Sequence, residues 1–189
     1  MEMLFSIPPK FPAGFTYVPD FLTIEDEENL LREVLRIPLH TFLFQGFEAK
    51  RKVASFGYDY SFERRDISKG TEIPDEFHWL IKKVKLFSGA TGNFEELLIT
   101  EYPVGSVINW HRDAPPFETI AGISLLSDCV FRMRPHDKSR RERKSIISFE
   151  TKRRSLYIME GESRLEWEHS ILPVKSTRYS ITLRTLRNY

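Results

Sequence analysis

Short segments in which apolar and polar residues alternate dominate the second half of the chain. In an extended strand, successive side chains point to opposite faces, so this pattern indicates β-strands with one buried face. Many short strands without helices between them predict a sandwich or barrel. Turn residues such as Pro, Gly and Asp separate the segments, which cover residues 95–102, 118–127, 129–134, 144–150, 155–160 and 178–184.

The first half of the chain has helical periodicity in two places. Residues 23–26 have the spacing of a capping box, and the apolar stripe that follows ends before Pro38. A second stripe starts at Phe77 and ends before Gly89. We expect both helices to cover the outer, apolar face of a sheet, which makes the protein mainly β with flanking helices (α+β). The stripes consist of Leu30, Leu31, Val34 and Leu35, and of Phe77, Leu80, Ile81 and Val84.

The composition is that of a globular protein: 41% of the 189 residues are hydrophobic and 29% are charged. The net charge is only +1, but residues 132–154 contain ten Lys or Arg and three acidic residues. Such a basic arm suits a phosphate backbone, although a solvated hairpin explains it equally well. The single cysteine, Cys129, excludes an internal disulfide, and no segment has the length and apolarity of a membrane span. We therefore expect a soluble, cytoplasmic, monomeric protein of one structural domain.

His111 and Asp113 are the first candidates for chemistry. They lie two positions apart in an extended segment, so both side chains can reach one metal ion. Alone, such a pair is more often a hydrogen-bonded surface pair, and a facial triad needs a second histidine. The other histidines are His40, His78, His136 and His169. The first three lie after a proline, in the second expected helix and in a charged loop, whereas His169 lies in an apolar, aromatic segment where an imidazole needs a partner.

Residues 178–184 alternate strictly between two faces. One face is apolar and indicates a buried side. The other carries two arginines separated by hydroxyl side chains, which suits bidentate binding of a dicarboxylate. The alternative is a half-exposed edge strand whose arginines lie in water. The polar face consists of Arg178, Ser180, Thr182 and Arg184, and the apolar face of Tyr179, Ile181 and Leu183.

These motifs together resemble the AlkB family of Fe(II)- and 2-oxoglutarate-dependent nucleic-acid dioxygenases. The resemblance rests on Tyr102 nine residues before His111, on GESR at 161–164 before His169, and on R-x5-R at 178–184. It covers residues 50–188, and within the family it is similar to short bacterial AlkB-like proteins and to the dioxygenase domain of animal tRNA-modifying homologues. The chain departs from the founding bacterial enzyme by having Thr in place of Asn two residues before Tyr102.

The resemblance implies a double-stranded β-helix, or jelly roll, in residues 93–189. Residues 1–92 would then form an N-terminal extension with the two helices and a nucleotide-recognition lid. Fe(II) and the co-substrates 2-oxoglutarate and O2 are implied, with nucleic acid as the partner. The implied residues are His111, Asp113 and His169 for iron, Tyr102, Arg178, Arg184 and Thr100 for 2-oxoglutarate, Tyr58, Phe56, Tyr60 and Arg51 for substrate, and Glu162 and Arg164 as supports of the ligands.

The expected activity is oxidative dealkylation of N-alkylated bases in DNA or RNA, as in alkylation-damage repair. Phe42 to Phe62 is rich in aromatic and basic side chains, which a site for an extruded base needs, although most such aromatics are core residues. One alternative keeps the oxygenase chemistry and acts on a modified tRNA base or a protein side chain. Another alternative is a zinc hydrolase or a jelly-roll binding protein. Arg178 and Arg184 argue against it, because such proteins have no stated need for these two arginines.

Overall fold

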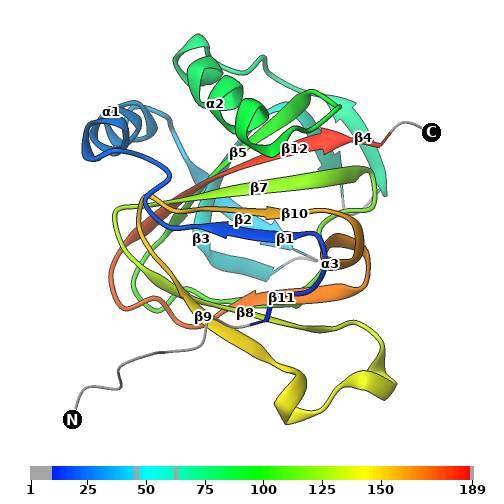
Figure 1. The fold of residues 1–189 in the computed structure, drawn as a ribbon. Coiled ribbons are helices and arrows are strands. Elements are labelled where there is room, and N and C mark those ends of the chain that lie inside the picture. The colour runs from blue at the N-terminus through cyan, green and yellow to red at the C-terminus, as the bar shows by residue number, and fades with distance from the viewer. Residues whose placement is uncertain (1–9, 45–46, 62–63, 188–189) are drawn as a thin grey trace.

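Two antiparallel β-sheets face each other in the computed structural model, which describes residues 10–44, 47–61 and 64–187 (Figure 1). The strands of the major sheet are β1 (Phe15–Val18), β2 (His40–Phe44), β3 (Phe47–Ser61), β4 (Asp66–Lys69), β5 (Phe94–Tyr102), β7 (Phe117–Leu125), β10 (Leu156–Met159) and β12 (Arg178–Leu186). Their order is β1-β10-β7-β12-β5-β3-β2, with β4 paired to β3. The minor sheet has the order β6-β11-β8-β9 and consists of β6 (Ile108–His111), β8 (Cys129–Pro135), β9 (Ile147–Thr151) and β11 (Trp167–Ile171).

This arrangement confirms the expected jelly roll, and all six strand segments expected from the pattern are present within a few residues. Six further strands were not among these segments: β1, β2, the long β3, β4, β6 and β11. The proposed division between residues 92 and 93 stays a prediction, but strands from both sides of it share the major sheet. Within the described ranges, no helix combines the length and apolarity needed to cross a membrane.

Helices α1 (Ile24–Val34) and α2 (His78–Ser88) cover the outer face of the major sheet (Figure 1). The capping box of α1 is confirmed, because Thr23 Oγ1 accepts from Asp26 N at 3.0 Å and Asp26 Oδ2 accepts from Thr23 N at 3.1 Å. Leu35 differs from expectation: it follows the last helical residue and is 66% exposed. The remaining short helices are η1 (Asp75–Phe77), η2 (Lys138–Arg140), η3 (Arg143–Ser145) and α3 (Gly161–Leu165).

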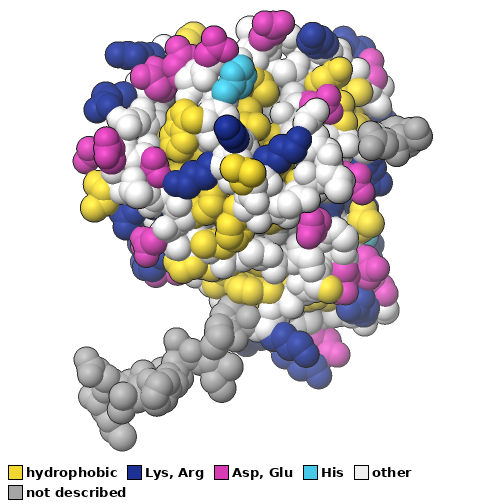
Figure 2. Space-filling view, turned by 45° about the horizontal axis from the view of Figure 1, so that its top comes forward, with side chains coloured by type: hydrophobic (Ala, Val, Ile, Leu, Met, Phe, Trp, Pro, Cys, Tyr) yellow, Lys and Arg dark blue, Asp and Glu magenta, His cyan; other side chains and the backbone are white. Residues whose placement is uncertain are grey.

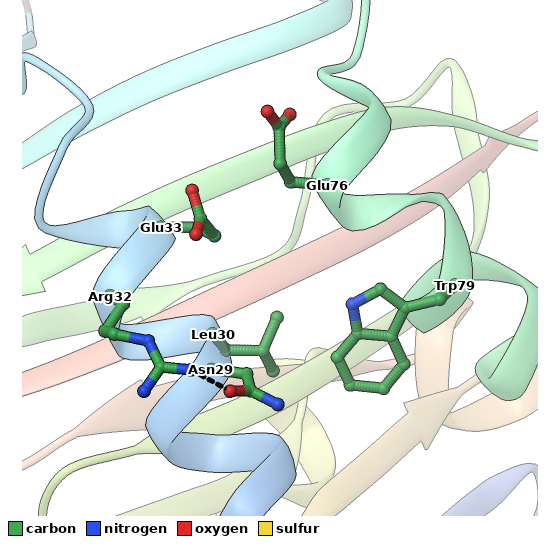
Figure 3. Close-up of a pocket in the computed structure, with 6 residues that line it drawn as sticks. All are labelled: Asn29, Leu30, Arg32, Glu33, Glu76 and Trp79. Carbon is green, nitrogen blue, oxygen red and sulfur yellow. Dashed lines mark hydrogen bonds between the residues drawn. The ribbon is translucent and has the colours of Figure 1, made fainter.

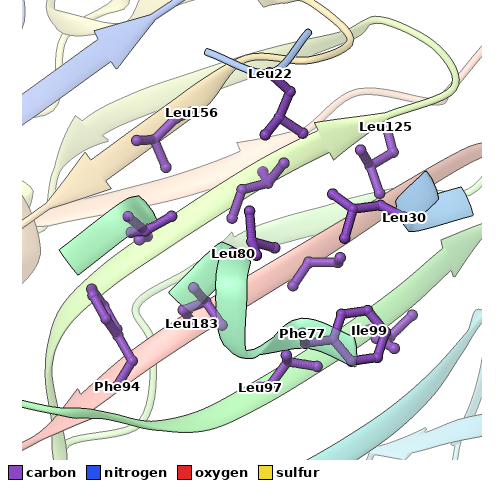
Figure 4. Close-up of a cluster of buried hydrophobic side chains, with 14 of the residues drawn as sticks. Leu22, Leu30, Phe77, Leu80, Phe94, Leu97, Ile99, Leu125, Leu156 and Leu183 are labelled. Carbon is purple, nitrogen blue, oxygen red and sulfur yellow. The ribbon is translucent and has the colours of Figure 1, made fainter. Parts of the chain in front are cut away.

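The helices and the outer face of the sheet enclose an apolar core (Figure 4). Leu30 of α1 and Leu80 of α2 lie in one cluster with Leu97, Ile99 and Leu183 of the strands. Burial of such side chains contributes about 1.5–3 kcal/mol each. Seen from the helix side, hydrophobic side chains also remain at the surface among charged ones (Figure 2).

Glu27 is an unexpected member of the buried face of α1. Its side chain is fully buried and accepts hydrogen bonds from Leu126 N at 2.9 Å and from Arg153 Nε at 3.0 Å. Leu126 follows β7 with a φ of 71°, a conformation that non-glycine residues adopt at a cost. Glu27 therefore ties α1 to the strained turn between β7 and β8.

We expect Glu27→Ala to lower the free energy of unfolding by about 2 kcal/mol, because the backbone N–H of Leu126 and the guanidinium of Arg153 lose their acceptor. Urea denaturation measures the change. Glu28→Ala is the matched control, because Glu28 is the exposed neighbour on the same helix, and it should change stability by less than about 0.5 kcal/mol. Equal effects of the two substitutions would contradict a special role of Glu27.

Candidate active site

His111, Asp113 and His169 converge between the sheets. His111 ends β6 and is the cross-strand partner of His169 in β11, while Asp113 follows two residues after β6. The Nε2 atoms of His111 and His169 lie 3.6 Å and 3.8 Å from the same atom, Asp113 Oδ1. One ligand atom from each residue lies within 4.8 Å of the other two. Two imidazole nitrogens and one carboxylate oxygen can therefore reach a single metal ion.

Neighbouring groups fix the direction of both imidazoles. His111 Nδ1 lies 2.9 Å from the carbonyl oxygen of Asn109. A proton on Nδ1 satisfies that carbonyl and leaves the lone pair of Nε2 free for a metal. The ring of Phe131 in β8 lies nearly parallel to that of His169, with an interplanar angle of 5° and centroids 5.4 Å apart. Both rings are thus held in place by atoms that take no part in metal binding.

His169 and Asp113 have the protonation states that a metal requires. Burial, followed by repulsion from His111, lowers the pKa of His169 to about 3, so its imidazole is neutral at physiological pH. Burial raises the pKa of Asp113, but the attraction of Arg184 and the contacts with both histidines outweigh it and hold this pKa well below its usual value. Neutral imidazoles and an ionised carboxylate are the metal-binding forms.

Arg184 joins the second oxygen of Asp113 to another carboxylate. Its Nε lies 3.3 Å from Asp113 Oδ2, and its Nη1 lies 2.6 Å from Glu96 Oε2. Because Oδ2 is occupied in this way, Oδ1 remains as the metal-facing oxygen. Glu96 in β5 was missed from the sequence, although its spacing from Thr100 and Tyr102 places all three on one face of the strand.

Arg178 is only 1% exposed and lies at the start of β12, between β5 and β7. This central position rules out an edge strand with arginines in water. Its Nε donates to Ser124 Oγ at 2.9 Å, and its guanidinium lies 4.8 Å from the ring centroid of Tyr102. Within the described residues, its buried Nη1 has no hydrogen-bond partner. A buried cationic donor without an acceptor fits a missing anion, and a carboxylate of 2-oxoglutarate meets that requirement.

The inner face of β12 between the two arginines is lined by hydroxyl groups. Ser180 Oγ donates to Tyr102 Oη at 3.5 Å, and Thr100 is the cross-strand partner of Ser180. All four residues expected to bind 2-oxoglutarate thus lie on the inner face of neighbouring strands. They are Thr100, Tyr102, Arg178 and Arg184.

Arg164 holds the loop that carries Asp113. Its Nη2 donates to the carbonyl oxygens of Asp113, Ala114 and Phe117 at 3.2, 2.7 and 2.9 Å. Glu162 acts at a greater distance from the metal ligands, because its Oε1 accepts from Trp167 Nε1 at 3.2 Å, at the start of β11. Both residues therefore support strands or loops that hold ligands.

The four residues expected to contact substrate do not share one face. Gly57 has a φ of 82°, which interrupts the alternation of β3. Phe56 before it packs against the apolar core under the helices, away from the metal ligands, whereas Tyr60 after it packs on the inner side.

Tyr58 lies opposite Lys69 in the β3–β4 hairpin. The guanidinium of Arg51 stacks over Phe42, 4.1 Å from the ring centroid, and its charge interacts with Tyr102. Residues 45–46 and 62 of the aromatic-rich segment lie outside the described residues.

The basic arm, residues 132–154, comprises most of β8 and β9 and the segment between them, which extends away from the sheets (yellow in Figure 1). Several of its cations are paired within the protein. Arg134 and Arg141 each contact Glu168 at 2.7 Å, and Arg153 contacts Glu27. The positive charge available to a partner is therefore smaller than the sequence suggests.

Trp110, which precedes the metal ligand His111, lies beneath two arginines of β8. The guanidinium carbons of Arg132 and Arg134 are 4.7 Å and 4.4 Å from its ring centroid. Arg132 Nε also donates to Ser170 Oγ at 3.0 Å. An aromatic ring and cations thus lie together on the outer face of the minor sheet, on the opposite side of β6 from the imidazole of His111. Trp110 was not anticipated from the sequence.

A groove of about 250 Å³ lies elsewhere, between α1 and α2 (Figure 3). Glu33, Glu76 and Trp79 line it, and Arg32 donates a hydrogen bond to Asn29 at its rim. Because the helices cover the outer face of the major sheet, this groove is separated from the metal ligands by the sheet itself.

Proteins of similar sequence include AlkB homologues. The chain is 27% identical over 210 residues to the "Alkylated DNA repair protein ALKBH8 homolog" of Arabidopsis thaliana, covering 93% of this chain and 59% of that protein. It is 28% identical over 171 residues to the mouse "tRNA (carboxymethyluridine(34)-5-O)-methyltransferase ALKBH8", covering 87% of this chain and 25% of that protein. The chain thus spans less than two thirds of either relative.

Solved structures share the fold at low sequence identity. The structure of OsALKBH1 has a TM-score of 0.73 at 14% identity and covers 94% of this chain and 99% of that one. A Pseudomonas putida prolyl-4-hydroxylase has a TM-score of 0.65 at 16% identity and covers 93% and 94% of the two chains. The resemblance to AlkB-like oxygenases expected from the motifs is confirmed. The family model described as "2OG-Fe(II) oxygenase superfamily" matches residues 14–187, and the chain belongs to that family.

Proposed function

We propose that this protein is a dioxygenase that oxidises an alkyl carbon on a nucleic-acid base. The observation that carries the proposal is the pairing of one facial triad with one buried, incompletely bonded arginine, Arg178, on the inner faces of the two sheets. Fe(II), 2-oxoglutarate and O2, which the superfamily uses, together supply the conversion of a C–H bond to C–OH with release of succinate and CO2. On an N-methyl group the hydroxylated carbon then leaves as formaldehyde.

The protein's own residues bind and orient the reactants. His111, Asp113 and His169 would hold Fe(II), with Arg184 keeping Asp113 bound through one oxygen. Arg178 would pair with a carboxylate of 2-oxoglutarate, beside the Tyr102 hydroxyl. Fixed positions of this kind lower the entropic part of the barrier and exclude water from the reacting atoms.

Two observations favour nucleic acid as substrate. Trp110, Arg132 and Arg134 lie together on the outer face of the minor sheet, behind the strand that carries His111, and an aromatic ring with nearby cations suits the bases and phosphates of a nucleic-acid strand. The Arabidopsis relative is named an alkylated DNA repair protein. We therefore place N-alkylated bases of DNA or RNA first, with Tyr58, Tyr60 and Arg51 as the proposed contacts from the β3–β4 side.

A modified tRNA base is the second candidate substrate. The mouse relative is named for a tRNA methyltransferase, and the similarity covers 87% of this chain. Only 25% of the mouse protein is covered, so the named transferase activity belongs to that whole protein. The oxygenase chemistry would be the same, and only the base presented to the metal would differ.

The test uses the full chain reconstituted with Fe(II) without oxygen, then supplied with 2-oxoglutarate, O2 and a substrate. The substrates are single-stranded oligonucleotides carrying 1-methyladenine or 3-methylcytosine and, separately, total tRNA. We expect loss of the methyl group with an equal amount of succinate, read by mass spectrometry. His111→Ala should abolish both, because the metal loses one of three ligands.

The outcomes separate the two substrates. Oxidation of a tRNA base without change in the oligonucleotides would replace the first candidate by the second. Absence of 2-oxoglutarate-dependent succinate with every substrate would contradict the proposed oxygenase. Lys82→Gln serves as the folding control, since Lys82 is exposed on α2, on the far side of the major sheet.

Arg132→Gln should weaken binding of a single-stranded oligonucleotide and lower the slope of log affinity against log salt by about 1, as expected for loss of one phosphate contact. Fluorescence anisotropy at several salt concentrations measures both quantities. Lys82→Gln removes the same charge from the opposite side and should leave the slope unchanged. An unchanged slope for Arg132→Gln would show that this surface does not contact the phosphate backbone.

A further inference from the structure

Tyr157 lies inside the sandwich and was not among the site residues expected from the sequence. It belongs to β10, and its cross-strand partner in β7 is Gly122. A Cβ atom built on Gly122 would lie 2.2 Å from Tyr157 Cζ and 2.5 Å from its hydroxyl oxygen. The end of the tyrosine ring therefore rests directly on the backbone of Gly122, where any side chain would displace it.

Two phenylalanines hold the ring of Tyr157. Phe15 in β1 stacks on it with centroids 6.2 Å apart and an angle of 11°, and Phe131 packs at 5.0 Å. Phe131 also stacks on the metal ligand His169. The ring of Tyr157 is thus held in place, and the ring of Phe131 lies between it and the metal ligand His169.

The hydroxyl of Tyr157 lies among the groups expected to bind 2-oxoglutarate. Gly122 beneath it is the register partner of Thr182, midway along the polar face of β12 that runs from Arg178 to Arg184. Burial raises the pKa of Tyr157, and the nearby charge of Asp113 raises it further, so the hydroxyl keeps its proton. The side chain is partly accessible, and its hydroxyl has no hydrogen bond to any described residue.

We propose that the Tyr157 hydroxyl is a further co-substrate-binding group, which donates a hydrogen bond to 2-oxoglutarate between the guanidinium of Arg178 and the carboxylate of Asp113. The proposal rests on the superfamily's use of 2-oxoglutarate and on the site proposed above. In this proposal Gly122 has a structural role, because its lack of a side chain leaves space for the ring of Tyr157. A protonated hydroxyl suits this position because it can donate to an anionic ligand.

The test measures binding without turnover. Mn(II) replaces Fe(II) in the full-length protein, and 2-oxoglutarate is titrated into it by calorimetry. Tyr157→Phe keeps the ring and removes the hydroxyl, so we expect about tenfold weaker binding of 2-oxoglutarate with unchanged affinity for Mn(II). Gly122→Ala, which displaces the ring, should weaken 2-oxoglutarate in the same direction.

Tyr179→Phe is the matched control, because Tyr179 lies on β12 with its side chain in the core under the helices. It should leave the affinity for 2-oxoglutarate unchanged. Tyr157→Phe with an affinity within about twofold of the wild type and an unchanged melting temperature would overturn the proposal. Failure of the wild-type protein itself to bind 2-oxoglutarate in the presence of Mn(II) would overturn the proposed co-substrate site, and the role of Tyr157 with it.

Discussion

The guanidinium of Arg184 between two buried carboxylates is the interaction on which the site depends. Glu96 and Asp113 come from strand and loop segments that are distant in sequence, and each would be costly to bury alone. Arg184 neutralises both and draws one oxygen of Asp113 away from the histidines. The contact with Arg184 therefore offsets the cost of burying the two carboxylates and leaves Oδ1 of Asp113 as the oxygen that faces a metal.

Such a polar interior is compatible with folding because one face of the major sheet packs against the helices and the other lines the site. The outer face and the two helices enclose an apolar core, which supplies most of the burial. The inner face carries arginines and hydroxyls opposite a smaller aromatic core on the minor sheet. Strand β12 serves both, since its odd residues Tyr179, Ile181 and Leu183 face the helices and its even residues face the metal ligands.

Features set by local pattern could be predicted from the sequence. The capping box at Thr23, the strict alternation of residues 178–184 and the His111-Asp113 spacing are all short-range signals, and the structure has each of them. Residues brought together across strands could not be predicted in this way. Glu96 stood in an expected strand without a known partner, and the alternation that places Phe56 depends on a positive φ at Gly57.

The contact between Gly122 and Tyr157 has a consequence for how the sequence can change over time. Because a β-carbon at position 122 would overlap the tyrosine ring, a side chain gained there requires a smaller residue at position 157. We therefore expect the two positions to change together: a homologous chain with a larger residue at position 122 should carry a smaller one at position 157. Their joint variation would divide the family according to how the space above β7 is filled.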